Sequence, residues 1–210
     1  MIKTKAGETL QRRLLPHQTA HAVLRAVPGF RDGAAVVFDR PREGQVVFEA
    51  IDWEHPRHQR FFASNRPFLA ESNPLEDCLT EDPIQVMFTG DCRSMRDVFE
   101  TLQREADGRY GVALTEYQHR DFSLVDVVGA GVSKGSALEQ WALAQGYGSE
   151  DVMAVGDNLN DLEMLEFAGT AVVMGNAAPS LKSRGWAVTG DNDSAGLAAA
   201  IETYVLGGAS

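Results

Sequence analysis

The chain has 210 residues, of which 44% are hydrophobic, 23% charged and 8% aromatic. These fractions are typical of globular proteins and exclude disordered, collagen-like and coiled-coil classes, and the length suffices for one large or two small domains. The formal net charge of −11 disfavours nucleic acids and anionic membranes as partners, because both repel an acidic surface.

The cysteine content and the N-terminus bear on the compartment. Cys78 and Cys92 lie far apart with neither a CxxC nor a ligand-like spacing, which favours a reduced setting over a disulfide framework. The first residues include lysines but no apolar run follows them, so we expect neither a secretory signal nor a membrane anchor. No window approaches the ~18 apolar residues of a spanning helix. We therefore expect a cytoplasmic protein.

The residues before Gly129 show mixed helix and strand patterns. Apolar residues at helical spacing predict helices at 16–27 and around 95–102, the first of them ended by Pro28-Gly29. A turn-rich loop at 40–44 joins the first two predicted strands into a hairpin. Runs of β-branched and apolar residues predict strands at 34–38, 45–51, 84–88, 110–116 and 122–128. This order predicts an α+β arrangement with antiparallel pairs.

After Gly129 the predicted strands and helices alternate strictly. Such alternation is typical of parallel strands linked by crossover helices. The strands are expected at 152–155, 171–174 and 186–189, and the helices at 136–145, 161–168 and from about 194 to 205. In the first of these helices, Ser136 and Glu139 have capping-box spacing, and Leu138, Trp141 and Ala142 are expected to face inward.

The loop after the strand at 152–155 is the strongest candidate for chemistry. It reads Gly156-Asp157-Asn158-Leu159-Asn160-Asp161, and open parallel sheets bind ligands beyond the carboxyl ends of their strands. For either aspartate alone, a cap on the next helix or simple solvation explains the residue equally well. The set as a whole favours a site for a hard cation, since carboxylate oxygens suit Mg²⁺ shared with a substrate phosphate.

A second candidate is Lys134, which stands in the segment Gly131-Val-Ser-Lys-Gly just before a predicted helix. Backbone N–H groups and the helix dipole favour an anion at such a place, and an ammonium group adds to this. A lone lysine before a helix is more often merely solvated. The segment matches neither the Walker A loop nor the dinucleotide-binding pattern, and no G-x-S-x-G elbow occurs in the chain.

Together these motifs resemble the C-terminal part of a haloacid dehalogenase (HAD) superfamily phosphatase of the Cof type. The resemblance implies an α/β, Rossmann-like parallel core that is incomplete at the N-terminus, with an inserted α+β cap domain. We expect residues 1–10 to be the remnant of an entry hairpin of the core, 11–128 the cap, and 129–210 the C-terminal part of the core. The resemblance rests on Gly131 to Gly135, Gly156 to Asp161 with Met164-Leu165, Met174-Gly175-Asn176-Ala177, Lys182, and Asn192 to Gly196.

The resemblance also implies roles for four residues. Lys134 matches a lysine that holds the phosphoryl group, and Asn160 an amide that contacts phosphate. Asp157 matches a Mg²⁺-ligating aspartate, and Asp161 a second acidic residue of the metal site that orients metal-bound water or the lysine. Such residues suit phosphoryl transfer, because cations stabilise the negative charge that is spread over the oxygens of the phosphoryl group.

The nucleophile of this family is an aspartate in a D-x-D-[GS]-T signature, and the chain contains no such sequence. The implied function is a Mg²⁺-dependent phosphatase of small phosphorylated metabolites such as sugar phosphates, which uses an aspartyl-phosphate intermediate when complete. We expect the 210-residue chain itself to be catalytically crippled. A non-catalytic metabolite-binding or regulatory module is the alternative. Either the recorded start lies within a longer reading frame, or the chain is a truncated relative that dimerises through an exposed core edge.

The substrate is left open by the sequence. Plausible specificity groups in the cap are Trp53, His55, Arg57, Arg60 and Arg66, although each is more often plain surface.

Overall fold

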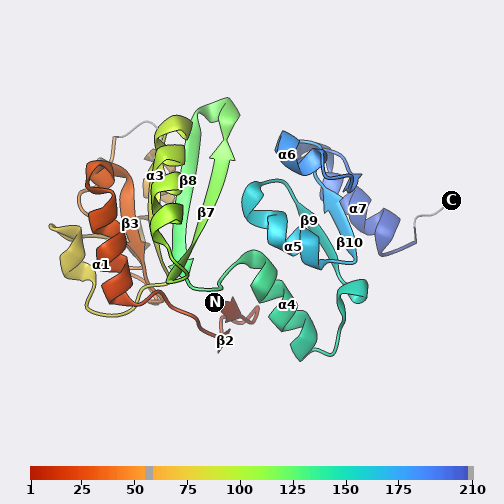
Figure 1. Cartoon of the computed structure of the whole chain (residues 1–210), viewed down its shortest axis with the longest axis horizontal. Coiled ribbons are helices and arrows are strands. Elements are labelled where there is room, and N and C mark those ends of the chain that lie inside the picture. Colours follow the sequence, from red (N-terminus) through yellow and green to blue (C-terminus); the bar gives the residue numbers. More distant parts are fainter. Residues whose placement is uncertain (55–58, 208–210) are drawn as a thin grey trace. The chain divides into compact units, whose positions relative to one another are not determined.

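The computed structural model describes residues 1–54 and 59–207, the side chain of Arg60 excepted, and these form two units, Met1–Val132 and Ser133–Ser210 (Figure 1). Among the described residues, no helix is both long and apolar enough to cross a membrane.

The first unit is built on a six-stranded sheet of order β5-β4-β3-β6-β8-β7. All neighbouring strands are antiparallel except β4 and β5, which are parallel. The strands are β3 (Ala34–Val37), β4 (Val46–Phe48), β5 (Leu69–Glu71), β6 (Gln85–Gly90), β7 (Tyr110–Tyr117) and β8 (Phe122–Gly129).

Alternating side chains of this sheet supply two apolar clusters on opposite faces. The larger cluster packs β-strand residues such as Val36 and Phe88 against α1 (His17–Ala26) and α3 (Cys92–Glu105), which stand together beside the sheet in Figure 1. The smaller cluster joins Ala35 and Phe48 to Phe62 of α2 (Gln59–Asn65). Because successive strand residues point to opposite faces, Val36 and Ala35 belong to different clusters.

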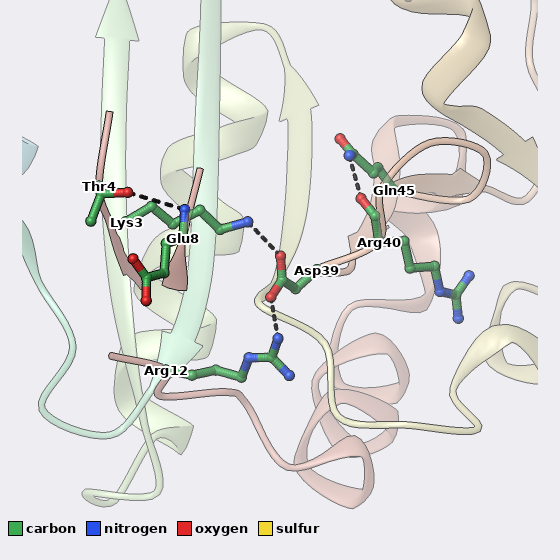
Figure 2. A network of polar contacts seen from close by, with 7 residues as sticks. All are labelled: Lys3, Thr4, Glu8, Arg12, Asp39, Arg40 and Gln45. Atoms are coloured by element: carbon green, nitrogen blue, oxygen red, sulfur yellow. Dashed lines mark hydrogen bonds and ion pairs between the residues drawn. The ribbon is translucent and has the colours of Figure 1, made fainter. Parts of the chain in front are cut away.

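A short hairpin of β1 (Ile2–Lys3) and β2 (Thr9–Gln11) precedes this sheet. It is tied to the end of β3 through Asp39, whose two carboxylate oxygens accept hydrogen bonds from Lys3 and from Arg12 (Figure 2). The Lys3 Nζ lies 2.8 Å from Asp39 Oδ1. The hairpin, which belongs to the first unit, is therefore attached to the six-stranded sheet by polar contacts.

The second unit contains a parallel sheet of order β11-β10-β9. The strands are β9 (Met153–Gly156), β10 (Thr170–Val173) and β11 (Ala187–Val188), and the helices are α4 (Lys134–Ala144), α5 (Leu162–Phe167), α6 (Pro179–Lys182) and α7 (Gly196–Tyr204). The core of this unit packs Leu165 and Leu181 against Ala154 and Val173. Within the described part of the chain, β9 pairs only with β10 and is thus an edge strand.

The predicted α/β class with parallel strands is confirmed, and so is the antiparallel hairpin of β3 and β4. Two details of the helix α4 differ from expectation. Its N-cap is Ser133, which pairs reciprocally with Ser136, so the expected box of Ser136 with Glu139 is wrong. Trp141 is 43% exposed, whereas Ala142 is buried as expected. The strand β5 and the helix α2 were not predicted.

Candidate functional site

The carboxyl ends of the three parallel strands meet along one edge of the sheet. Backbone hydrogen bonds link the residues that follow them, since the Met174 N–H donates to Gly156 at 3.0 Å and the Gly175 N–H to Gly190 at 3.1 Å. Ligands of open parallel sheets bind at this edge. The predicted loop Gly156 to Asp161 therefore lies where a ligand site is expected.

The loop after β9 is folded around the carboxylate of Asp161. Its Oδ2 accepts the backbone N–H groups of Asp157 at 3.0 Å and of Asn158 at 3.1 Å. The Asp161 side chain is only 6% exposed. A side chain at Gly156 would place a Cβ 2.6 Å from that of Asp161, so glycine is needed for this close approach.

Lys134 reaches this loop from the first residue of α4. Its Nζ lies 2.5 Å from Asp161 Oδ1 and 3.3 Å from Asn160 Oδ1. The side chain of Lys134 is 52% exposed, so the ammonium group is paired on one side and open to solvent elsewhere. Its positive charge lies in a strongly acidic part of the chain, because from residue 129 onward three Lys and Arg side chains stand against ten of Asp and Glu.

Asp157 is half-buried at the start of the loop. Its Oδ2 accepts a hydrogen bond from Asn176 Nδ2 at 3.2 Å, and Asn176 Oδ1 in turn accepts the Asn192 N–H at 2.9 Å. Asn176 therefore connects the loops that follow all three strands. Asn176 belongs to one of the motifs of the resemblance, but no role was predicted for it. Its position could have indicated a role, because Asn176 lies just past the end of β10 as Asp157 lies just past the end of β9.

The structure thus brings all four predicted site residues into one cluster. Lys134 contacts Asp161 and Asn160, and Asp161 accepts the N–H of Asp157. Helix α4 is held next to α5, the helix that follows this loop, by contacts of Ser133 and Gly135 with Glu163, and neither Ser133 nor Gly135 was predicted as functional.

The donor set of this cluster fits Mg²⁺. Among the described residues, no group of three or more His, Cys, Asp and Glu side chains is placed to hold a metal ion. Mg²⁺ needs no such cage, because it keeps several waters and takes one or two carboxylates together with substrate phosphate. Asp161 already accepts three hydrogen bonds, whereas Asp157 accepts one from Asn176 and keeps capacity for a hard cation.

The candidate specificity groups of the first unit are only partly described. His55 and Arg57 lie outside the described residues, as does the side chain of Arg60. The guanidinium carbon of Arg66 lies 4.7 Å from the centre of the Trp53 ring. This is a cation–π geometry, so Arg66 and Trp53 contact each other in the first unit.

The fold and this cluster define an α/β protein with a polar site at the carboxyl ends of parallel strands. A family model described as haloacid dehalogenase-like hydrolase matches residues 1–201, so the chain belongs to that family. This confirms the resemblance drawn from the motifs.

Three proteins illustrate the relationship. The chain is 46% identical over 82 residues to pyridoxal phosphate phosphatase YbhA of Escherichia coli, which is 39% of this chain and 30% of that protein. It is 39% identical over 82 residues to 5-amino-6-(5-phospho-D-ribitylamino)uracil phosphatase YcsE of Bacillus subtilis, which is 39% of this chain and 33% of that one. A haloacid dehalogenase-like hydrolase from Bacteroides thetaiotaomicron has the same fold at 25% identity and a TM-score of 0.70, over 95% of this chain and 71% of that one.

The matches also show a difference in length. The chain spans less than half the length of the first curated relatives that it matches, between 28% and 48%.

Proposed function

We propose that the protein is a Mg²⁺-dependent phosphatase that acts on small phosphorylated metabolites such as sugar phosphates. The observation that carries this proposal is the contact of Lys134 with Asp161 and Asn160 at the carboxyl ends of the parallel strands. An ammonium group held there beside carboxylates would bind a phosphate, and the carboxylates would hold the metal ion that neutralises its charge. The named activities of the relatives, which include two phosphatases of small phosphate esters, support the class.

Of the four site residues, two are proposed to serve the metal ion and two to bind the phosphate. Asp157 would hold the metal ion, and Asp161 would complete the acidic pair, while its carboxylate holds the loop and orients Lys134. Lys134 and Asn160 bind the phosphoryl oxygens. Mg²⁺, when bound, neutralises charge on the phosphate. Positioning and charge stabilisation of this kind supply most of the catalysis in phosphoryl transfer.

The nucleophile is the remaining requirement. No D-x-D-[GS]-T sequence occurs in the 210 residues, so they supply the cation-binding part of the site without the expected nucleophilic aspartate. Residues 11–128, which lie within the first unit, serve as the cap that selects the substrate. The relatives' named substrates differ from one another, which is consistent with a shared phosphate site and a variable selecting surface.

Phosphate release tests this function. The 210-residue chain and a form extended upstream in its reading frame are assayed with Mg²⁺ or EDTA against sugar phosphates and pyridoxal phosphate. Mg²⁺-dependent release is expected from an extended form that contains D-x-D-[GS]-T, and none above background from the 210-residue chain. If an extended form contains the signature but shows no turnover, the proposed phosphatase activity is contradicted. Turnover by the 210-residue chain would contradict the claim that these residues lack the nucleophile.

The alternative is a non-catalytic module that binds a phosphorylated metabolite, which the named phosphatases among the relatives do not favour. Calorimetry with Mg²⁺ and a sugar phosphate separates the two. Binding without turnover in either form supports the module, whereas turnover in the extended form excludes it.

A homodimer through the edge strand β9 is part of the proposal. An apolar edge strand invites pairing with another strand, and β9 reads Met-Ala-Val-Gly. Sedimentation is expected to give the mass of two chains, and Met153→Lys, which places a charge in this edge, is expected to give one. A monomeric wild-type chain would rule the homodimer out.

A further inference from the structure

The three residues that open helix α4 all contact one short segment of the chain, residues 160–163. Ser133 Oγ donates a hydrogen bond to Glu163 Oε2. Lys134 Nζ donates to Asp161 and Asn160. Gly135 packs directly on Glu163. The start of α4 is therefore held at three consecutive positions.

The hydroxyl of Ser133 joins two interactions. As the N-cap of α4, its Oγ accepts the Ser136 N–H at 3.0 Å, while Ser136 Oγ accepts the Ser133 N–H at 2.9 Å. A hydroxyl has a single proton to donate, and here Glu163 receives it. The carboxylate of Glu163 thus fixes the rotamer of the residue that caps the helix.

Gly135 makes the second attachment possible. A Cβ at this position would lie 2.5 Å from Glu163 Cβ and 2.6 Å from the Glu163 carbonyl carbon. Because the latter is a backbone atom, no side-chain movement could relieve the clash. The backbone of α4 can approach α5 this closely only with glycine at position 135.

Lys134 lies between these two attachments. The side chain of Lys134 is long and half-exposed, so its amine can meet Asp161 only when the backbone at residue 134 lies within reach. The position of its amine therefore depends on where the first turn of α4 is held. Both flanking residues are held by Glu163, one through its carboxylate and one through its backbone.

We infer that Glu163 is a positioning residue for Lys134. Its carboxylate holds the Ser133 cap so that the amine of Lys134 stays at Asp161 and Asn160. The value of this position for phosphate rests on the proposed function, but the positioning itself is a property of the folded chain and is measurable without turnover.

The test compares Glu163→Ala and Glu163→Gln with the same two changes at Glu166. Glu166 lies on the same helix, is exposed and pairs with Arg184, so it is a matched control. The readout is the rate at which an amine-reactive ester labels Lys134 in the 210-residue chain, resolved by peptide mass spectrometry. An amine released from Asp161 and Asn160 is more accessible to the reagent.

Glu163→Ala is expected to raise the labelling rate of Lys134 roughly three- to tenfold, the population change that accompanies the loss of one hydrogen bond. Glu163→Gln is expected to restore a rate near that of the wild type, because its amide oxygen can still accept the Ser133 hydroxyl. Both Glu166 variants should leave the rate unchanged.

Three results would overturn the inference. One is a wild-type rate in Glu163→Ala. Another is an equal rise in Glu163→Gln, which would indicate a charge effect. A third is an equal rise in the Glu166 variants, which would indicate general loosening of α5. If the proposed function is wrong, the extended form will show no Mg²⁺-dependent turnover. The labelling result does not depend on turnover and can be interpreted in either case.

Discussion

Lys134 Nζ lies 2.5 Å from Asp161 Oδ1, although the two residues are 27 positions apart in the sequence. The same carboxylate accepts two backbone N–H groups of the loop after β9. One buried side chain therefore shapes the loop and also holds the cation beside it.

Asp161→Ala is expected to destabilise the chain by about 2–4 kcal/mol, because two backbone N–H groups lose their acceptor in a buried place. Asp161→Asn should cost less, since an amide oxygen still accepts one of them. The midpoint of chemical denaturation measures both, with the exposed Glu166→Ala as control. Equal stability of the wild type and Asp161→Ala would contradict the role of this carboxylate in the loop.

Asp157→Asn is expected to weaken Mg²⁺ binding by about tenfold or more, because a neutral amide replaces a charged hard ligand. Calorimetry of the 210-residue chain with Mg²⁺ in the presence of inorganic phosphate measures the change. Glu202→Gln, on α7, removes the same charge away from the loop and serves as control. If both variants weaken binding alike, the effect is that of net charge and Asp157 is no ligand.

The hairpin of β1 and β2 should depend on Asp39. The hydrogen bond from Lys3 lowers the pKa of Asp39 and has the largest effect, while burial, which raises this pKa, has the next largest. The positive charges of Lys3 and Arg12 lower the pKa further, so that it lies below its usual value. Because the folded pKa is the lower one, the stabilisation is present above the unfolded pKa of about 4 and is lost as the pH falls through the folded pKa.

Hydrogen exchange of the amides in Ile2–Lys3 and Thr9–Gln11 measures this attachment. At neutral pH these amides should exchange faster in Asp39→Asn than in the wild type, whereas the exposed Asp97→Asn should change nothing. The ratio between variant and wild type should begin to fall below about pH 4 and should approach one only below the folded pKa of Asp39. A ratio that stays constant with pH would contradict the attachment through the Asp39 carboxylate.

Cys78 should resist alkylation. Burial raises the pKa of its thiol to about 11 from an ordinary 9.0. Two pKa units lower the thiolate fraction about a hundredfold near pH 8, and the thiolate is the reactive form. Iodoacetamide labelling, followed by peptide mass spectrometry and compared with free cysteine, measures the rate. Labelling of native Cys78 at the rate of free cysteine would show that the thiol is not buried.

The sequence predicted those parts of the fold that repeat a pattern over many residues. Helix α3 and strands β7 and β8 are long and periodic, and their prediction is confirmed. Strand β5 has only three residues, which is too short to show a periodic pattern. It pairs in parallel with β4, so no hairpin turn next to it indicates a strand either.

The site divides in the same way. Asp157 and Asp161 could be predicted because a strand places its exit loop at a known edge of a parallel sheet. Asn176 could have been found by the same argument, since it follows β10 as Asp157 follows β9. Glu163 could not, because its importance lies in a side-chain contact with Ser133 that only the folded chain brings about. The expected cytoplasmic setting and the absence of nucleic-acid partners stay predictions.

The most direct test of the account maps phosphate onto the chain. Amide NMR spectra of the 210-residue protein are recorded during a titration with inorganic phosphate, with and without Mg²⁺. We predict that the signals of Lys134 and of residues 156–161 shift together, more strongly with Mg²⁺, and that Lys134→Ala abolishes the shifts while Arg184→Ala preserves them. Shifts confined to other residues, or shifts at the loop that survive Lys134→Ala, would contradict a shared phosphate and metal site.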